Sequence, residues 1–399
     1  MANDLQYVVK QHYANAVQDR LEKSLVAMDL AGMIDIPNWT TKNLPLVQMR
    51  STGNYTKYTA QTIADVDTSN DQIIIDTNPM VNFALDDLDE DDNYINIKPE
   101  IIADASYQIK KRIDWDFFAQ VMNAKWKYDA NGFGVNTGTL SPITLVTGAS
   151  QNISATFGWA KAGLVSVGAN WNNAILWVDP FTINSLTTLW LEQGYNIADE
   201  SYSRGFKGMF GWMKAYEVSN LYGSTSFAMA TEPTADDYFY IQGVKFTFKA
   251  VPSLPWEIDL SGTAATTVDN VVLAINGTGT PSATTYIELT SEDRARLEGV
   301  TATDATTSIT IVSKWGQLTA TSSMTAAAND FAAQVVNCTV MEKWAIKMAL
   351  RNAVKVSSAR EPLKLVTNYF IYARYWLKVT TRSKERIVVI PLVSKAAEA

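Results

Sequence analysis

The spacing of apolar side chains changes along the chain, and each spacing predicts a different kind of element. Residues 4–33 carry apolar side chains at roughly helical intervals, which predicts a helical N-terminal arm that ends near Gly32. Residues 44–85 have a β-like pattern rich in Thr and Asn, which Gly53 and Pro79 interrupt. This pattern predicts a long two-stranded excursion. Because an isolated hairpin is only marginally stable in water, we expect this excursion to pack against another chain.

A long amphipathic helix is predicted after Pro99, a residue that suits the first turn of a helix. About 27 residues at ~1.5 Å each span roughly 40 Å, which is longer than an ordinary helix of a compact domain. We therefore expect this helix to act as a beam. Its inward positions are expected to be Ile102, Ala105, Ile109, Ile113, Phe117, Val121 and Met122.

A helix, a strand and a second helix follow the beam in that order. Residues 154–168 are helix-like, residues 173–179 form an apolar run typical of a buried strand, and Pro180 opens another helix. This order predicts an α/β layer. Residues 204–223 combine glycines with aromatic side chains, a texture typical of a loop and strand packed close to neighbouring backbone.

The composition shifts at about Thr231, and Thr, Ala and Gly dominate until about Val340. We predict a separate α+β unit of ~100 residues there, which is long enough to bury its own core. Its expected elements are a hairpin around Gly243, a helix over 264–276 with Val268, Val271, Val272 and Ile275 inward, a second helix over 291–299 and a closing strand, SITIVS. The chain then ends in two strand-like runs, YFIYARYWLKVT and RIVVIPLV.

Composition and charge exclude several classes of protein. The 399 residues include 12 Trp, 17 Tyr and 14 Phe, so the chain has ample material for a core. The net charge of −8 has the wrong sign for a protein whose main surface grips phosphate backbones. No stretch reaches the ~18 to 20 apolar residues of a membrane span, and no signal peptide is recognisable at the start.

The sequence lacks the reactive side chains that the common types of catalytic site require. His12 is the only histidine and Cys338 the only cysteine, so a Ser-His-Asp or Cys-His nucleophile and an N/S-ligated zinc site both lack residues. No HExxH, CxxC, GxGxxG or GxxxxGK[ST] motif occurs. We therefore expect no catalytic residue, no metal and no cofactor.

Residues 86–92 hold six carboxylates around Leu88. A calcium loop of the EF-hand type that starts at Asp87 would have Asp92 where the turn glycine belongs and Lys98 where the bidentate Glu belongs. The favoured interpretation is a solvated acidic segment before a helix, whose N-terminal dipole favours negative charge.

The order of these parts resembles that of a tailed-phage major capsid protein. FALDDLDEDD before the long helix resembles the family's return from the extended E-loop into the spine helix, and NNAILWVDPFTINSL resembles the strand and helix of its axial domain. GFKGMFGWMKAYEVSNL and ARYWLKVTTRSKERIVVI resemble a glycine-flanked segment with its following strand, here Tyr216 to Asn220, and the C-terminal strands. The chain departs from the family at Trp376, where relatives often have glycine after the tyrosine.

The resemblance implies an α+β fold of the Hong Kong 97 type with a small α+β insertion. The implied parts are an N-terminal arm over 1–44, an E-loop over 45–84, a peripheral (P) domain over 85–140 and 366–399, an axial (A) domain over 141–230 and 341–365, and an insertion domain over 231–340. Insertions of this family usually project from the outer surface or contact neighbouring capsomers. Insertion at a loop whose ends lie close together is physically tolerated.

The implied function is a structural one: self-assembly, through pentamers and hexamers, into an icosahedral shell around double-stranded DNA. The implied partners are other copies of the chain, scaffolding, portal and decoration proteins, and packaged DNA without sequence specificity, in a virion assembled in the host bacterial cytoplasm. Because the core fold begins almost at once, we expect a separate scaffolding protein and no long N-terminal cleavage. Two alternatives stay open: an encapsulin-type nanocompartment shell, and a carbohydrate-binding or adhesion protein of the virion.

A shell protein binds several copies of itself through contacts that are individually modest. On the excursion, Arg50, Tyr55, Lys57 and Tyr58 are candidate contacts with a neighbouring subunit. Their expected partners are carboxylates of the acidic run: Asp86, Asp87, Asp89 and Glu90. Plain solvated loop side chains are the competing interpretation.

Overall fold

The computed structural model describes most of the chain and divides it into two compact units, which are taken separately below. Unit 1 comprises the described residues of 31–113 and 346–382, and unit 2 those of 22–30, 114–345 and 383–399. The described residues are 27–35, 41–47, 68–86, 98–145, 153–184, 206–210, 213–314, 316, 318–324, 329–361 and 366–393.

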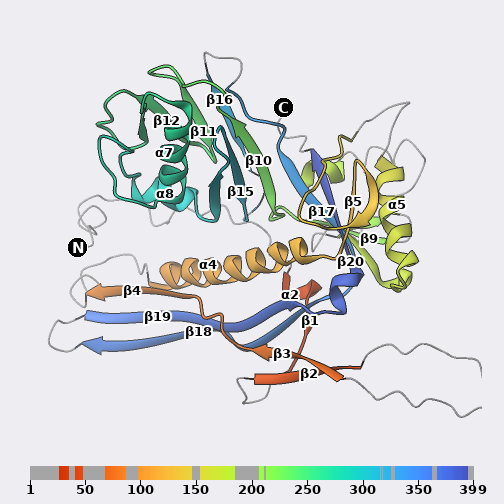
Figure 1. Cartoon of the computed structure of the whole chain (residues 1–399). Coiled ribbons are helices and arrows are strands. Elements are labelled where there is room, and N and C mark those ends of the chain that lie inside the picture. Colours follow the sequence, from red (N-terminus) through yellow and green to blue (C-terminus); the bar gives the residue numbers. More distant parts are fainter. Residues whose placement is uncertain are drawn as a thin grey trace, which may run out of the picture. The chain divides into compact units, whose positions relative to one another are not determined.

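Unit 1 is built on a four-stranded sheet in the order β1–β18–β19–β4 (Figure 1). Its two long strands, β18 (Ile346–Glu361) and β19 (Val366–Val379), run antiparallel, with irregular register between Leu350 and Lys355. β4 (Met80–Asp86) pairs antiparallel with the first half of β19, and β1 (Gly32–Met33) adds a short parallel edge to β18. The segment before the long helix is thus bonded to the segment near the C-terminus.

The predicted beam is helix α4 (Lys98–Ala119), which contains 22 residues and is followed by a 3-10 turn over Gln120–Asn123. At ~1.5 Å per residue the α-helical part is about 33 Å long, shorter than expected because its last turn tightens into 3-10 geometry. Pro99 lies in the first turn, as predicted. Five of the seven predicted inward positions are buried, and Ile102 and Met122 are half-buried.

The predicted excursion is only partly a two-stranded element. β2 (Thr41–Val47) and β3 (Thr68–Ile74) pair antiparallel with each other, and the residues between them lie outside the described ranges. The expectation that the excursion continues to residue 85 is wrong, because β4 pairs with β19 instead. The ring of Phe83 stacks on that of Tyr369 with 5.1 Å between centroids, which fixes β4 to the larger sheet.

Unit 2 contains a ten-stranded sheet whose main path is β14–β15–β10–β17–β20–β5–β6. The predicted buried strand is β7 (Ala174–Val178), every residue of which is buried, and residues 180–184 after it are helical, as expected from Pro180. The helix predicted before it is α5 (Ile153–Ser166). The remaining strands are β5 (Trp126–Asp129), β6 (Gly132–Val135), β8 (Phe206–Phe210), β9 (Met213–Glu217), β10 (Gly223–Ala228), β14 (Val300–Asp304), β15 (Ser308–Ser313), β17 (Val335–Glu342) and β20 (Ile387–Val393).

The two C-terminal runs lie in different sheets. β19 belongs to the sheet of unit 1, whereas β20 pairs antiparallel with β17 and parallel with β5 in unit 2. A short 3-10 helix, Ser383–Arg386, separates them. The pairing also groups residues 346–361 with β19, although the resemblance groups 341–365 with 141–230. The full set of domain boundaries stays a prediction.

The Thr-rich region has its own four-stranded sheet, β13–β12–β11–β16, together with α7 (Ala264–Asn276) and α8 (Ser291–Arg296). The expected hairpin joins β11 (Tyr238–Ile241) to β12 (Val244–Lys249), with β13 (Glu257–Asp259) and β16 (Ala320–Ser323) on either side. Gln242 and Gly243 both have positive φ, 52° and 78°, as the tight turns of hairpins require. Gly243 supplies that conformation without strain.

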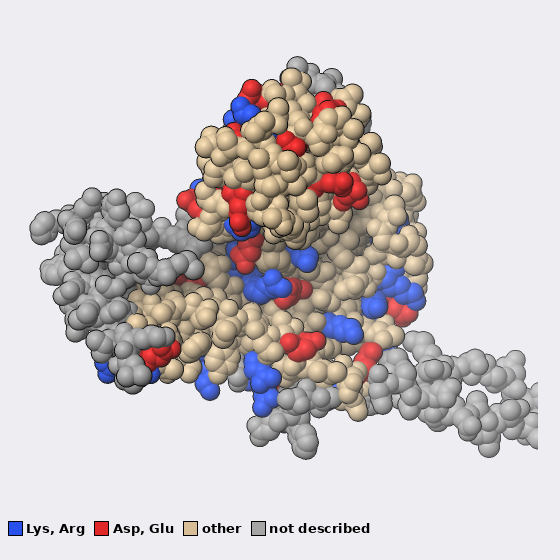
Figure 2. Space-filling view, turned by 60° about the vertical axis from the view of Figure 1, so that its left-hand side comes forward, with Lys and Arg blue, Asp and Glu red and all other residues tan. Residues whose placement is uncertain are grey.

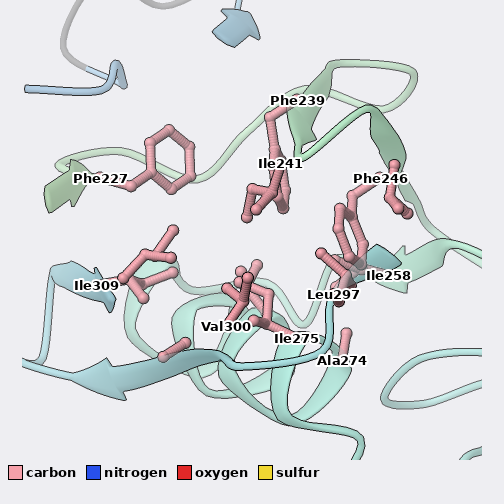
Figure 3. Packing of buried hydrophobic residues seen from close by; sticks show 14 of the residues in the cluster. Phe227, Phe239, Ile241, Phe246, Ile258, Ala274, Ile275, Leu297, Val300 and Ile309 are labelled. Carbon is pink, nitrogen blue, oxygen red and sulfur yellow. The ribbon is translucent and has the colours of Figure 1, made fainter. Parts of the chain in front are cut away.

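A single hydrophobic cluster joins this sheet to α7 and to β14 and β15 (Figure 3). Phe239, Ile241 and Phe246 extend from the sheet, and Ala274 and Ile275 extend from the helix. Val268 and Val271 of the helix are buried as predicted, while Val272 is half-buried. The strand SITIVS does not close the small sheet: it is β15, and it pairs with β10 and β14 in the larger sheet.

Candidate assembly surface

Most of the predicted contact residues lie outside the described part of the chain. This holds for Arg50, Tyr55, Lys57, Tyr58, Asp87, Asp89 and Glu90. Asp86 is described as the last residue of β4, opposite Val366 of β19. The predicted pairing of these groups between subunits therefore stays a prediction, and the described part of unit 1 offers a different surface.

The sheet formed by β4, β19 and β18 has two unlike faces. Opposite residues of antiparallel strands point to the same side, so the register assigns each side chain to a face. One face carries Val81, Phe83, Tyr369 and Ile371, of which Tyr369 and Ile371 are buried. In Figure 1, α4 runs along the length of β19 and β18.

The other face, which we call the uncovered face, is largely open to solvent. Met80 of β4 is 57% exposed, and Phe370 and Tyr372 beside it on β19 are half-buried. On β18, Lys355 lies opposite Tyr372 and is exposed, and so are the other residues of this face towards the strand end. An apolar strip is thus flanked by polar side chains, the composition typical of an interaction surface.

The β2–β3 hairpin packs on the same side of the sheet beyond the uncovered face, around Trp376. Trp376 is 6% exposed and forms a small cluster with Ile73, Ile75 and Ala349. Asp71 of β3 accepts hydrogen bonds from the backbone N and the Oγ1 of Thr381, both at 3.0 Å. The tryptophan that departs from the family pattern therefore holds the hairpin to the sheet, which a glycine cannot do.

The charges of the uncovered face are unevenly distributed. Glu361 lies beside Val366 at the end of the sheet that precedes α4, whereas Lys355, Arg374 and Lys378 follow along the strands towards the other end. Arg374 donates a hydrogen bond from its Nε to Oδ1 of Asn78, an uncharged partner, at 2.8 Å. Within the described ranges the side chains of Lys355 and Lys378 are exposed and have no ion-pair partner.

A buried polar junction in unit 2 was missed by the sequence analysis. Asp114 on α4 is 2% exposed; its Oδ1 accepts from the backbone N of Ala27, at 2.9 Å, and its Oδ2 from Nδ2 of Asn220, at 3.1 Å. Ala27 is the first residue of the short helix α2 (Ala27–Leu30), so the carboxylate caps a helix N-terminus. The available signal was a carboxylate among the inward positions of an amphipathic helix.

Helix α5 exposes apolar side chains to solvent in unit 2. Trp159 is 63% exposed, and Val165, about 120° away around the helix, is also exposed. The buried side of the helix lies close to β6, since a Cβ added at Gly163 would lie 2.2 Å from the ring of Phe133. The missing side chain at Gly163 permits this approach.

The pKa values of two described groups are shifted by their surroundings. Burial raises the pKa of the Cys338 thiol well above its usual value, and the nearby Asp179 carboxylate raises it further, so the thiol stays protonated. Burial opposes ionisation of Asp129, but hydrogen bonds from Lys127 and from two backbone amides lower its pKa overall. Among the described residues no group of three or more His, Cys, Asp or Glu side chains could hold a metal ion, and no helix is long and apolar enough to cross a membrane.

Figure 2 shows basic and acidic side chains interspersed over one face of the molecule. The described surface visible there has no broad area of one sign, unlike the basic surface expected of a protein that grips nucleic acid.

Comparison with known proteins gives a match at the level of structure alone. No protein-family model matches the sequence. No curated protein matches it either. The similar solved structures include the mature capsid of bacteriophage PhiM1 (10% identity, TM-score 0.49, covering 96% of this chain and 92% of that one). They also include the capsid of Ralstonia phage GP4 (10%, 0.47, 96% and 94%) and that of the cyanophage P-SCSP1u (11%, 0.46, 98% and 95%). The chain is thus similar over nearly its whole length to phage capsid proteins.

Proposed function

We propose that this chain is the major capsid protein of a tailed phage, which assembles with copies of itself into the icosahedral shell that encloses double-stranded DNA. One observation carries the proposal. The strand before the long helix, β4, is bonded to β19 from the C-terminal part of the chain, and this sheet also holds the β2–β3 hairpin. An excursion, a long helix and returning C-terminal strands in this order match the parts that the sequence resemblance implies.

The physical requirements of a shell are consistent with the described surfaces. Each subunit must bind several others, and closure makes individually modest contacts sufficient. The uncovered face of unit 1 and the exposed Trp159 of α5 in unit 2 give each unit an exposed apolar surface. Some charged side chains form ion pairs within the chain, such as Lys125 with Glu385 at 2.7 Å.

Scaffolding, portal and decoration proteins and packaged DNA are the further partners of this proposal. The excess of acidic residues supports weak attraction between the wall and the packed genome. The insertion domain, with a core of its own, is proposed to project from the shell or to contact neighbouring capsomers.

The experiment is electron microscopy of negatively stained protein, expressed with its scaffolding protein and purified by sedimentation. We expect closed polyhedral particles that sediment far faster than the 44.1 kDa subunit. Particles that contain an enzyme in place of DNA when isolated from the natural source would favour an encapsulin-type compartment. A protein that stays monomeric or trimeric with every scaffold and salt condition, or that binds glycans, would refute the proposal.

A further inference from the structure

The uncovered face of unit 1 has the composition of a surface that binds another protein. Met80, Phe370 and Tyr372 form an apolar centre, and basic side chains lie beside it. The aromatic and methionine side chains are of the types enriched in protein interfaces. The question is which molecule covers this face.

Charge complementarity indicates an acidic occupant, and the chain itself contains one. The face carries Lys355, Arg374 and Lys378, while residues 86–92 hold six carboxylates in seven positions. Asp86 begins this run at the acidic end of the same sheet, beside Val366. Each copy therefore carries an acidic segment at one end of the sheet, with Lys355 midway along it and Lys378 at the other end.

The run cannot reach the far end of its own sheet. Lys378 lies 12 residues along β19 from Val366, a distance of about 40 Å at ~3.3 Å per residue. The chain from Asp86 to the start of α4 at Lys98 contains 12 steps, so at ~3.6 Å per step it is at most about 43 Å long. Because it must leave and return, its furthest excursion is about half of that. The run of the same chain therefore does not reach Lys378, although it can reach the level of Lys355, about 20 Å from Val366.

We propose that the acidic run 86–92 of one subunit binds the uncovered face of the next, with its carboxylates on Lys355 and Lys378 and its apolar neighbours against Tyr372. This inference rests on the proposed function and names the contact by which copies recognise each other. The contact is head to tail, because the surface and the segment are different parts of the chain. Head-to-tail contacts close into rings when the rotation between copies permits, as the capsomers of a shell require.

The contact is electrostatic at an exposed surface, and this has a kinetic consequence. Exposed ion pairs are individually weak and are screened by salt. Complementary charge mainly accelerates encounter and selects the register of the partners. Assembly should therefore be slower in higher salt, while completed shells persist because many contacts must break together.

The test is a charge swap in the full-length chain. The double variant Lys355→Glu with Lys378→Glu reverses the face, and each position is exposed, so the subunit should fold as before. We expect assembly yield with the scaffolding protein to fall about tenfold or more, since two attractions become repulsions. Lys384→Glu is the matched control, an exposed lysine of the other unit, and should assemble as the wild type does.

Rescue distinguishes this contact from a general loss of positive charge. A second set of substitutions, Asp87, Asp89, Glu90 and Asp91 each to Lys, reverses the run and should block assembly alone. Combined with the reversed face in one chain, it restores complementary charge between copies and should recover shells. Circular dichroism and thermal unfolding of each variant confirm that the subunit is folded.

The possible outcomes separate the inference from the function on which it rests. A wild-type protein that forms no shells refutes the proposed function itself. Wild-type shells together with undiminished assembly of the reversed face, or no recovery in the combined variant, refute only the inference. Shells of the reversed face that form normally but retain less DNA would show that the face binds nucleic acid instead, and would also overturn it.

Discussion

Replacing Asp114 with alanine should destabilise unit 2, because it removes the acceptor of at least two buried hydrogen bonds. The carboxylate is 2% exposed and accepts from the backbone N of Ala27 and the side-chain amide of Asn220. An unpaired buried donor costs about 1 to 3 kcal/mol. Two such donors give a loss of about 2 to 6 kcal/mol in the free energy of unfolding.

The measurement is denaturant unfolding of the purified subunit, read by tryptophan fluorescence. The Asp114→Asn variant keeps one acceptor oxygen and should lose less, about 1 to 3 kcal/mol. A double-mutant cycle with Asn220→Ala should give a coupling energy of about 0.5 to 3 kcal/mol. Asp269→Ala, at an exposed position of α7, is the control and should change stability by less than about 0.5 kcal/mol. A loss at Asp114 no larger than that of the control would refute the assigned role.

Three further predictions concern packing and titration. Phe239→Ala should lower the free energy of unfolding by about 3 to 5 kcal/mol, because the ring is fully buried and stacks 5.0 Å from that of Phe246; thermal unfolding that is unchanged would contradict this. Trp376→Gly should cost a similar ~3 to 5 kcal/mol and loosen the β2–β3 hairpin, seen as faster amide exchange at Ile73; equal exchange in both proteins would argue against it. Cys338 should resist iodoacetamide in the native protein at pH 8 and react after denaturation. Because burial raises its folded pKa, its contribution to stability is complete below the usual thiol pKa of about 8.5 and declines at higher pH; native labelling at the denatured rate would oppose this.

Elements with a strong local period were predictable from the sequence. The helical repeat before Phe117, the apolar run of β7 and the turn at Gly243 each depend on residues close together in the chain, and the structure has the corresponding helix, strand and hairpin. The exact end of α4 was not predictable, since the last turn tightens into 3-10 geometry without a glycine or proline to mark it.

Strand partners could not be read from the sequence. SITIVS looks the same whether it closes a small sheet or extends a large one, and the choice depends on pairing with β10, about 80 residues earlier. The same holds for β4, whose alternation fits either a hairpin or the edge of the β19 sheet. Pairing energies arise from cross-strand neighbours, which a single sequence does not specify.

The candidate surface was predictable only in its chemistry. The sequence drew attention to the acidic run and to the idea of basic partners on a neighbouring copy, but it assigned those partners to Arg50 and Lys57, which lie outside the described residues. Lys355 and Lys378 became candidates only when the register placed them on one face with Tyr372. The junction of Asp114 with Asn220 joins residues 106 positions apart, a separation that no periodicity reveals.

The position of β20 in the middle of its sheet has a consequence for synthesis. Its flanking strands, β17 and β5, leave the ribosome before it, and β5 waits for more than 250 residues of later chain. At ~5 to 20 residues per second this wait is roughly 13 to 50 s. Nascent subunits therefore lack the strand that joins β17 to β5 until residues 387–393 have left the ribosome, and chaperones can hold them during this period.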